Sequence, residues 1–276
     1  MAVTRVVAVT GGARGVGRAI ANAAAKAGAN VAIGDIDGVE VAAAAAQLAT
    51  RSIGLLLDVA DHASFTTFLE VVETELGPID VLVNNAGIMP TGAFEDEPDE
   101  LTRRIIDINV HGVLNGSKLA ARRMLRRGSG HIVNVASGAG YICAPGIVTY
   151  CGSKHAVVGI TEALRLELGP RGIDVTVVAP GVIDTELTSG LPDVIGMGRV
   201  PPEVVARAVV RAFDHPRAAV FAPRRVAVIS TVAKLLPARA RDALFAVAGA
   251  GGGYLDTDAT ARAPYMARVL SAAHRS

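Results

Sequence analysis

The sequence is poor in several residue types that mark particular classes of protein. It contains no tryptophan, and only 4% of its residues are aromatic. It has two cysteines, Cys143 and Cys151, and neither forms a metal-binding spacing with the histidines. We therefore expect no disulfide framework and no metal site, and a reducing compartment such as the cytoplasm.

The chain also lacks a dominant charge and a long apolar run. Its net charge is +1 with both signs interspersed, so neither a basic patch nor an aromatic platform indicates nucleic-acid binding. No run reaches the roughly 18 apolar residues of a membrane span. The nearest candidate starts at Val226 and is interrupted by Lys234 and Pro237. The first residues do not resemble a secretory signal peptide.

The sequence is rich in apolar residues, which occur in short runs at regular intervals. The chain has 276 residues, 51% of them hydrophobic, which is enough for a large core. Short β-branched runs alternate with alanine-rich helical patterns, and the runs are continuously apolar, as in a parallel sheet buried on both faces. Strands are predicted at 5–9, 31–35, 53–58, 80–83, 131–136, 174–179 and 218–223. Helices are predicted at 17–26, 39–49, 63–76 and 150–168, with two helical stretches over roughly 100–127. This alternation predicts an α/β protein with a single doubly wound sheet.

The segment "VTGGARGVGRAI" follows the first strand and opens the first helix. Glycines at 11, 15 and 17 allow a tight turn and a close approach of the backbone to a pyrophosphate. The helix N-terminus offers N–H groups to that anion. The strand–loop–helix context favours dinucleotide binding over an ordinary tight turn.

The type of dinucleotide depends on two residues of opposite charge. Asp35 lies 18 residues after Gly17, at the end of the second strand, where a carboxylate accepts bonds from a ribose 2′-OH and repels a 2′-phosphate. Arg14, in the loop, is suited to receive that phosphate. We give more weight to Asp35 and expect NAD, with NADP as the alternative.

Four further sequence features, besides the glycine loop, indicate a particular protein family. "NNAG" (84–87) ends the fourth strand, "PGVIDT" (180–185) ends the sixth, and "TYCGSK" places Tyr150 four residues before Lys154. Ser137 lies 13 residues before Tyr150. With the glycine loop, these motifs resemble the classical short-chain dehydrogenase/reductase family over roughly residues 5–222. The resemblance implies a Rossmann-type sheet with helices on both faces.

The resemblance also implies a cofactor groove and a catalytic set. Asp58 and Val59 would bracket the adenine, Asn84, Ala86 and Gly87 would line the groove and stabilise the sheet, and Thr185 would hold the nicotinamide carboxamide. The full predicted cofactor set is Thr10, Gly11, Arg14, Gly15, Val16, Gly17, Asp35, Asp58, Val59, Asn85, Ala86, Gly87, Tyr150, Lys154, Pro180, Gly181, Val182 and Thr185. The implied catalytic residues are Asn109, Ser137, Tyr150 and Lys154.

The chemistry of the catalytic set is consistent with proton transfer. A free tyrosine has a pKa of about 10, and a nearby ammonium and an oxidised nicotinamide would lower it. Tyr150 would then take the proton of an alcohol, or return it to a ketone. Ser137 would bind the substrate oxygen, Lys154 would also bind the ribose, and Asn109 would hold a relay water.

The loop at 186–202 follows the nicotinamide contact and carries Leu187, Leu191, Val194, Ile195 and Met197. These apolar residues suggest a lipophilic secondary alcohol or ketone that is steroid-like, retinoid-like or long-chain. An alternative is that they only pack the loop. The predicted substrate contacts are Ser137, Tyr150, Leu187 and Leu191.

Two other functions stay open. A protein of the same fold could bind NAD(P) as a regulator without catalysis, although the complete catalytic set argues against this. An epimerase or dehydratase for nucleotide-linked sugars would usually have a different glycine spacing and a larger C-terminal domain. We expect a homodimer or homotetramer, with helices 110–127 and 150–168 as the family's dimer face.

The last part of the chain departs from the simpler family pattern. Residues 1–223 are predicted to form the dinucleotide-binding and catalytic domain, and 224–276 a C-terminal helical extension packed on or near the substrate site. It includes a flexible "GAGGGY" at 249–254. The extension admits three interpretations: extra packing, a lid over an apolar pocket, or a shallow contact with a membrane surface.

Overall fold

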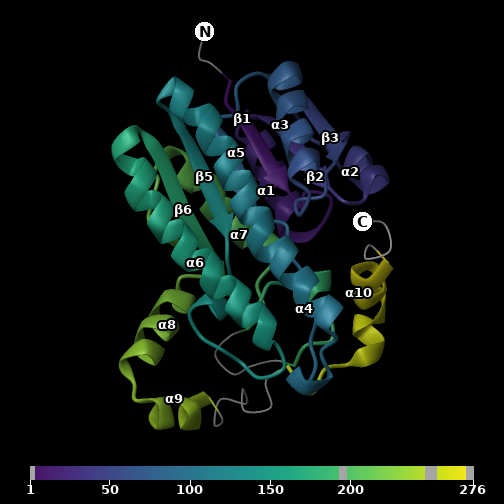
Figure 1. The fold of residues 1–276 in the computed structure, drawn as a ribbon, viewed down its shortest axis with the longest axis vertical. Helices are drawn as coiled ribbons and strands as arrows, with labels where there is room; N and C mark the ends of the chain where they lie inside the picture. The colour runs from purple at the N-terminus through teal and green to yellow at the C-terminus, as the bar shows by residue number, and fades with distance from the viewer. Residues whose placement is uncertain (1–3, 193–197, 246–253, 272–276) are drawn as a thin grey trace.

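The computed structural model describes residues 4–192, 198–245 and 254–271. Its centre is a seven-stranded sheet in the order β3-β2-β1-β4-β5-β6-β7 with every neighbouring pair parallel (Figure 1). The strands are β1 (Val6–Thr10), β2 (Asn30–Asp35), β3 (Ser52–Leu56), β4 (Val81–Asn84), β5 (Gly130–Val135), β6 (Ile173–Pro180) and β7 (Ala219–Ala222). The predicted doubly wound sheet of seven strands is confirmed.

Helices connect these strands and continue after the last one. The main helices are α1 (Gly15–Lys26), α2 (Gly38–Ala45), α3 (His62–Leu76), α4 (Asp99–Ile106), α5 (Gly112–Arg127), α6 (Val148–Leu168) and α7 (Pro202–Asp214). The extension contributes α8 (Arg225–Leu235), α9 (Ala238–Phe245) and α10 (Ala259–Ser271). Short helical turns are η1 (Phe94–Asp96), η2 (Asp107–His111), η3 (Gly138–Gly140), η4 (Gly169–Arg171) and η5 (Glu186–Thr188).

Two helix boundaries differ from the sequence prediction in an informative way. α1 begins at Gly15, because the helix starts inside the glycine loop. α2 ends at Ala45, four residues before the predicted end at 49. The two predicted helical stretches over 100–127 are α4 and α5, and η2, a π-helical turn, joins them. A π turn is hard to predict from hydrophobic periodicity, and such turns often occur at functional sites.

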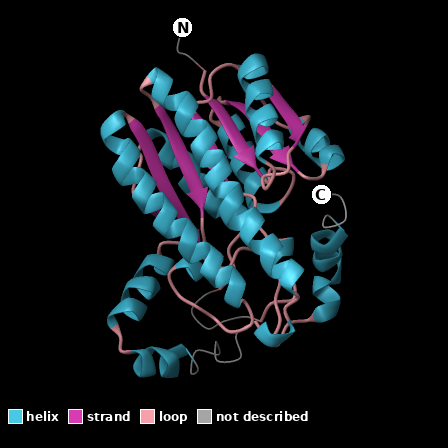
Figure 2. Ribbon diagram, viewed as in Figure 1, coloured by secondary structure: helices cyan, strands magenta, loops and turns pink. Residues whose placement is uncertain are grey.

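Helices cover both faces of the sheet (Figure 2). Two apolar cores lie between the sheet and these helices, one on each face. Successive strand residues alternate between them: Val7 and Val9 contribute to one core, and Val6 and Ala8 to the other. Helices α1, α2 and α7 cover the first face, and α3, α5 and α6 cover the second. Burial on both faces explains why the strands are continuously apolar.

A buried polar network ties the central strands to helices of the second face. The Asn84 amide donates to Asn134 Oδ1 (2.8 Å) and to Ser117 Oγ (3.2 Å). The Asn134 amide donates in turn to Thr161 Oγ1 (3.0 Å). Asn84 is therefore buried inside the protein, where it ties β4 to β5 and α5, and its place in the cofactor groove stays a prediction.

The extension divides into two parts in space. Helix α8 packs beside β7, and α9 follows it, whereas α10 lies at the other side of the molecule near α4 (Figure 1). Within the described residues no helix is both long and apolar enough to cross a membrane. The predicted glycine-rich segment lies largely outside the described residues. The predicted oligomer and the contact with a membrane surface stay predictions.

Replacing Asn134 with Ala should test the buried network. The substitution removes the bonds to Asn84 and Thr161 and leaves a cavity, so we expect the free energy of unfolding to fall by about 2 kcal/mol. Urea denaturation of the wild type and the variant measures this. The matched control is Asp174→Ala on the exposed face of β6, which should change stability by less than about 0.5 kcal/mol. Equal effects of the two substitutions would contradict the assignment.

Candidate active site

The loop after β1 is held against the loop after β4. Thr10 Oγ1 accepts hydrogen bonds from the backbone N–H groups of Asn85 (2.9 Å) and Ala86 (3.0 Å). The Asn85 amide donates to the carbonyl oxygens of Thr10 (2.9 Å) and Gly11 (3.2 Å). Thr10 and Asn85 thus shape the predicted cofactor loop by bonding to each other's backbone.

The glycines of this loop occupy positions where a side chain does not fit. Gly11 and Gly15 have positive φ values of 62° and 53°. A Cβ on Gly17 would lie 2.1 Å from the Gly11 carbonyl oxygen. Val16 is half-buried in the first turn of α1, beside these glycines.

The start of α1 is suited to an anion. Its first turn contains no acidic residue, and the side chain of Arg14, the N-cap residue, does not cap it. The first N–H groups of a helix need acceptors, and a pyrophosphate provides them. The open helix start and the close glycine turn together fit a dinucleotide.

Asp35 lies at the end of β2, beside this loop. Its carboxylate accepts hydrogen bonds from the backbone N–H groups of Ala13 (3.1 Å) and Asp37 (3.2 Å). Burial raises the pKa of Asp35 above its ordinary value, and these two bonds oppose the shift. Arg14 pairs with Asp37 (2.8 Å) and lies 3.6 Å from Glu40. The carboxylates of Asp35, Asp37 and Glu40 therefore all act on the Arg14 guanidinium, which a 2′-phosphate would need as its partner.

Asp58 and Val59 follow β3 at the same edge of the sheet. Asp58 Oδ1 accepts from the Ala60 N–H (2.9 Å), and the Asp58 N–H donates to Ser64 (3.0 Å). Val59 is buried against Gly112, where an added Cβ would lie 2.8 Å from a Val59 methyl. Both residues are thus fixed in a turn beside the groove.

Tyr150 and Lys154 lie one turn apart on α6 and are both buried, with 6% and 4% of their surfaces exposed. Lys154 Nζ donates to the Val135 carbonyl (3.0 Å) and lies 5.6 Å from the centre of the Tyr150 ring. Burial lowers the pKa of Lys154 to about 8. Gly87 lines the same space, since a Cβ there would lie 3.3 Å from Lys154 Nζ.

Ser137, two residues after β5, lies close enough to the Tyr150 hydroxyl to favour a lower pKa of that phenol. Burial nevertheless dominates and raises the pKa of Tyr150 above that of a free phenol. We expected the ammonium of Lys154 to lower the pKa of Tyr150. In the protein without cofactor, the effect of burial is larger, and the pKa is raised. The Ser137 hydroxyl also accepts the Ala139 N–H (3.1 Å), which fixes the side chain at the start of η3.

Asn109 lies in the π turn η2 and is fully buried. Its Oδ1 accepts from the Ile88 N–H (2.9 Å), and its amide donates to the Ile88 carbonyl (3.0 Å) and to Ser153 Oγ (3.0 Å). Ser153 donates to the Tyr150 carbonyl (2.7 Å). Both amide protons are thus occupied, so the side chain links α6 to the loop after β4. Ser153 was missed in the sequence, where it looks like an ordinary helix residue.

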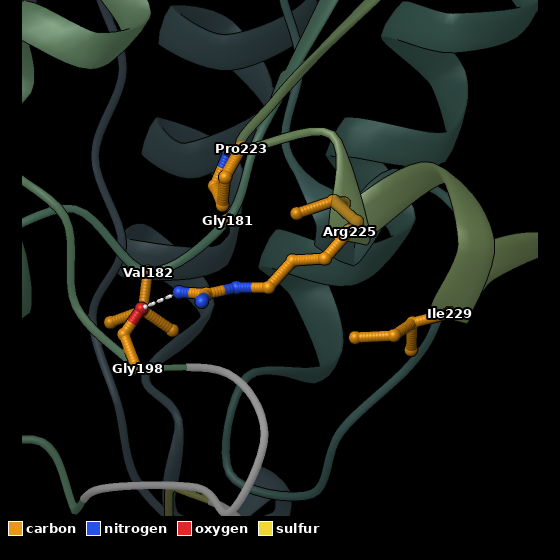
Figure 3. A pocket seen from close by; sticks show the side chains of 7 residues that line it. Gly181, Val182, Gly198, Pro223, Arg225 and Ile229 are labelled. Carbon is orange, nitrogen blue, oxygen red and sulfur yellow. Dashed lines mark hydrogen bonds between the residues drawn. The ribbon is translucent and has the colours of Figure 1, made fainter.

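The loop after β6 lies at the same edge of the sheet as the other loops of the candidate site. The Gly181 N–H donates to the Ala222 carbonyl (2.9 Å), and Gly181 and Val182 line a small pocket with Pro223 and Arg225 (Figure 3). Pro180 ends β6, next to Gly138. A Cβ added to Gly15 would lie 3.5 Å from the Thr185 methyl. Thr185 therefore faces the glycine loop from the opposite wall.

An apolar cluster surrounds the Tyr150 ring. Its buried members besides Tyr150 are Met89, Ile147, Cys151 and Leu191, and Leu187 and Tyr254 pack against them. The structure thus places the predicted substrate contacts Leu187 and Leu191 beside Tyr150. Val194, Ile195 and Met197 lie outside the described residues.

No metal site accompanies this cluster in the part of the chain that the structure describes, where no three potential ligands gather. Cys151 is buried beside Tyr150, and burial raises the pKa of its thiol to about 11, so it stays a packing residue. Neither cysteine is in a disulfide bond. His131, also buried, has a pKa lowered to about 4 by burial and contacts Thr176.

The comparison with known proteins agrees with this geometry. A family profile described as short chain dehydrogenase matches residues 5–194. The chain belongs to the short-chain dehydrogenase/reductase family of oxidoreductases. The match ends before the extension, so the relationship to the family does not account for α8, α9 and α10.

Several relatives share a large part of this chain. The 3-alpha-(or 20-beta)-hydroxysteroid dehydrogenase of Mycobacterium tuberculosis is 37% identical over 216 residues, which cover 76% of this chain and 83% of that protein. The 3-oxoacyl-acyl-carrier-protein reductase FabG of Haemophilus influenzae is 40% identical, covering 68% and 78%. The probable oxidoreductase EphD of Mycobacterium tuberculosis is 41% identical over 66% of this chain, which spans about a third (32%) of its length.

Solved structures give the same fold. A short-chain type dehydrogenase/reductase from Mycobacterium marinum has a TM-score of 0.71 at 31% identity, covering 79% of this chain and 93% of its own. A 3-ketoacyl-acyl-carrier-protein reductase from Brucella melitensis, complexed with NADH, has a TM-score of 0.72 at 26% identity, covering 79% and 96%.

Replacing Gly17 with Ala should show whether the loop binds a dinucleotide. A Cβ so close to the Gly11 carbonyl must displace the loop, so we expect the dissociation constant for NADH to rise at least about tenfold. Calorimetric titration measures this. The control is Gly159→Ala on α6, where an added Cβ meets no atom within 4 Å. Unchanged NADH binding by the Gly17 variant would rule out this loop as the pyrophosphate site.

Proposed function

We propose that this protein transfers a hydride between NAD and a lipophilic secondary alcohol or ketone, with Tyr150 as the general acid/base. The observation that carries the proposal is the convergence of Tyr150, Ser137 and Lys154 in one buried space. The loop after β4, which is bonded to the glycine loop at Thr10, passes beside Lys154 at Gly87. The nicotinamide cofactor, when bound, supplies the hydride donor or acceptor.

The residues around the substrate oxygen have complementary tasks. In ketone reduction the Tyr150 phenol donates its proton, and its raised pKa keeps that proton in place until the oxygen becomes basic. Ser137 orients the phenol and can share its hydroxyl with the same oxygen. Lys154, with a pKa of about 8, is positively charged at neutral pH and stabilises the phenolate that remains. In alcohol oxidation the same groups act in reverse order.

The positions of Asn109 and Ser153 support proton transfer indirectly. Their hydrogen bonds fix the first turn of α6, which carries Tyr150, against the loop at Ile88. A fixed phenol needs less reorganisation when the proton moves. A regulator without catalysis would not require such a constrained phenol and ammonium, and for this reason we rank that alternative lower.

The ribose site favours NAD over NADP. Asp35 is held at the end of β2, and Arg14 is already paired with Asp37 and close to Glu40. A 2′-phosphate would meet the carboxylates and would have to compete with them for the guanidinium. The Brucella melitensis reductase structure, to which this chain is similar, is described as complexed with NADH.

The substrate class rests on the apolar cluster. Met89, Leu187 and Leu191 present apolar side chains beside Tyr150. Such a wall favours a hydrocarbon skeleton over a small polar alcohol. The resemblance to a hydroxysteroid dehydrogenase supports the same class.

Replacing Tyr150 with Phe should test the mechanism. Loss of the phenol removes the proton donor, so we expect kcat to fall at least about a thousandfold while NADH binding changes less than about threefold. The reactions are reductions of a steroid-like and a long-chain ketone. Tyr141→Phe is the matched control, because Tyr141 packs against Phe221 away from this site. Substantial turnover by the Tyr150 variant would refute the assigned role.

Replacing Asp35 with Ser should test the cofactor choice. We expect kcat/KM with NAD to fall about tenfold and the NADP-to-NAD ratio to rise, because a carboxylate that binds the ribose and repels phosphate is lost. Initial rates with both cofactors measure the ratio, and Asp174→Ser serves as an exposed acidic control. A wild-type enzyme that prefers NADP would show that Arg14 prevails.

A further inference from the structure

Helix α10 brings a buried cation to the substrate side of the site. Arg262 is only 2% exposed, and its guanidinium donates to the carbonyl oxygens of Met89 (2.7 Å), Ser189 (3.0 Å) and Leu187 (3.2 Å). It therefore joins α10 to the loops after β4 and β6. Among residues 4–192, 198–245 and 254–271, no carboxylate pairs with Arg262, and its Nε–H is buried with no acceptor.

Tyr265 stands next to this cation. Its ring centre lies 5.2 Å from the guanidinium carbon of Arg262, and its hydroxyl oxygen accepts the Met89 N–H (2.7 Å). The side chain is 92% buried, since 8% of its surface is exposed. The hydroxyl proton itself has no acceptor among the described side chains and backbone groups. A buried donor with no acceptor is costly and calls for an explanation.

The two groups adjoin the catalytic space. Met89, whose backbone binds both Tyr265 and Arg262, belongs to the apolar cluster around Tyr150. Tyr265 is one of the lesser causes that raise the pKa of Tyr150, after burial. Burial raises the pKa of Tyr265 itself to about 12, so it stays protonated and is a donor at neutral pH.

We propose that Tyr265, held by Met89 and Arg262, donates its hydroxyl proton to a second oxygen of the substrate, at a distance from the oxygen that Tyr150 protonates. The inference rests on the proposed oxidoreductase function and narrows it to lipophilic substrates that carry two oxygens. A carbonyl, hydroxyl or ester oxygen satisfies the donor, and the nearby guanidinium favours such a negatively polarised atom.

A purely structural role is the competing explanation. The Tyr265 oxygen accepts the Met89 N–H, so its loss would disturb the loop for every ligand equally. Donation to a second oxygen affects only ligands that have one. A comparison of matched ligands separates the two effects, because the common disturbance cancels in the difference.

The test uses two pairs of ketones that differ in one oxygen. The first pair is octan-3-one and octane-3,6-dione, and the second is 5α-androstan-17-one and 5α-androstane-3,17-dione; none of the four carries a hydroxyl group that NAD could oxidise. Dissociation constants are measured by calorimetry on the NAD-saturated enzyme, in which a ketone is not reduced. Reduction with NADH is measured separately, so that failure of the proposed function appears as absent turnover by the wild type.

We expect Tyr265→Phe to weaken binding of the two-oxygen member of at least one pair about tenfold and to change its one-oxygen partner less than twofold. Tyr141→Phe, the matched control, should change none of the four constants. Equal weakening of both members in each pair would overturn the proposal and leave Tyr265 as a support for the loop. Unchanged binding of all four ligands, or no binding to the wild type, would overturn it too.

Discussion

All seven parallel strands end at one edge of the sheet, and the candidate site depends on that constraint. The loops after β1, β2, β4, β5 and β6 carry the glycine turn, Asp35, Gly87, Ser137 and Thr185, which are far apart in the sequence. The chain joins two of these loops directly, because Thr10 and Asn85 hydrogen-bond each other's backbone. Because the strands are parallel, the five loops that follow them lie together at one edge of the sheet, where a ligand can contact all of them.

Burial then determines the chemistry of that groove. An ammonium and a phenol removed from water both shift toward their neutral forms, which lowers the pKa of Lys154 and raises that of Tyr150. Their position is stabilised by fixed polar partners: the Val135 carbonyl for Lys154, and Ser137 for Tyr150. Behind them, the buried Asn84 amide donates to Asn134 Oδ1, and the Asn134 amide donates to Thr161, which ties the central strands to α6.

The extension changes what this shared framework can bind. It lies beyond the family match, yet α10 reaches back to the loops after β4 and β6 through Arg262 and Tyr265. The same helix buries an arginine that no described carboxylate pairs with and a phenol proton that no described group accepts. Arg262 and Tyr265, which lie outside the family match, are therefore the candidates for a specificity determinant that this chain adds.

The sequence by itself determined the sheet, its parallel direction and the helix order, because continuous apolar runs and glycine turns are local patterns. It also indicated Tyr150 and Lys154, whose spacing is that of one helical turn. It did not determine the π turn at Asn109, the direction of Asn84, or the place of Tyr265 against Met89. Those depend on contacts between residues up to 176 positions apart, as between Met89 and Tyr265, and only tertiary packing decides them.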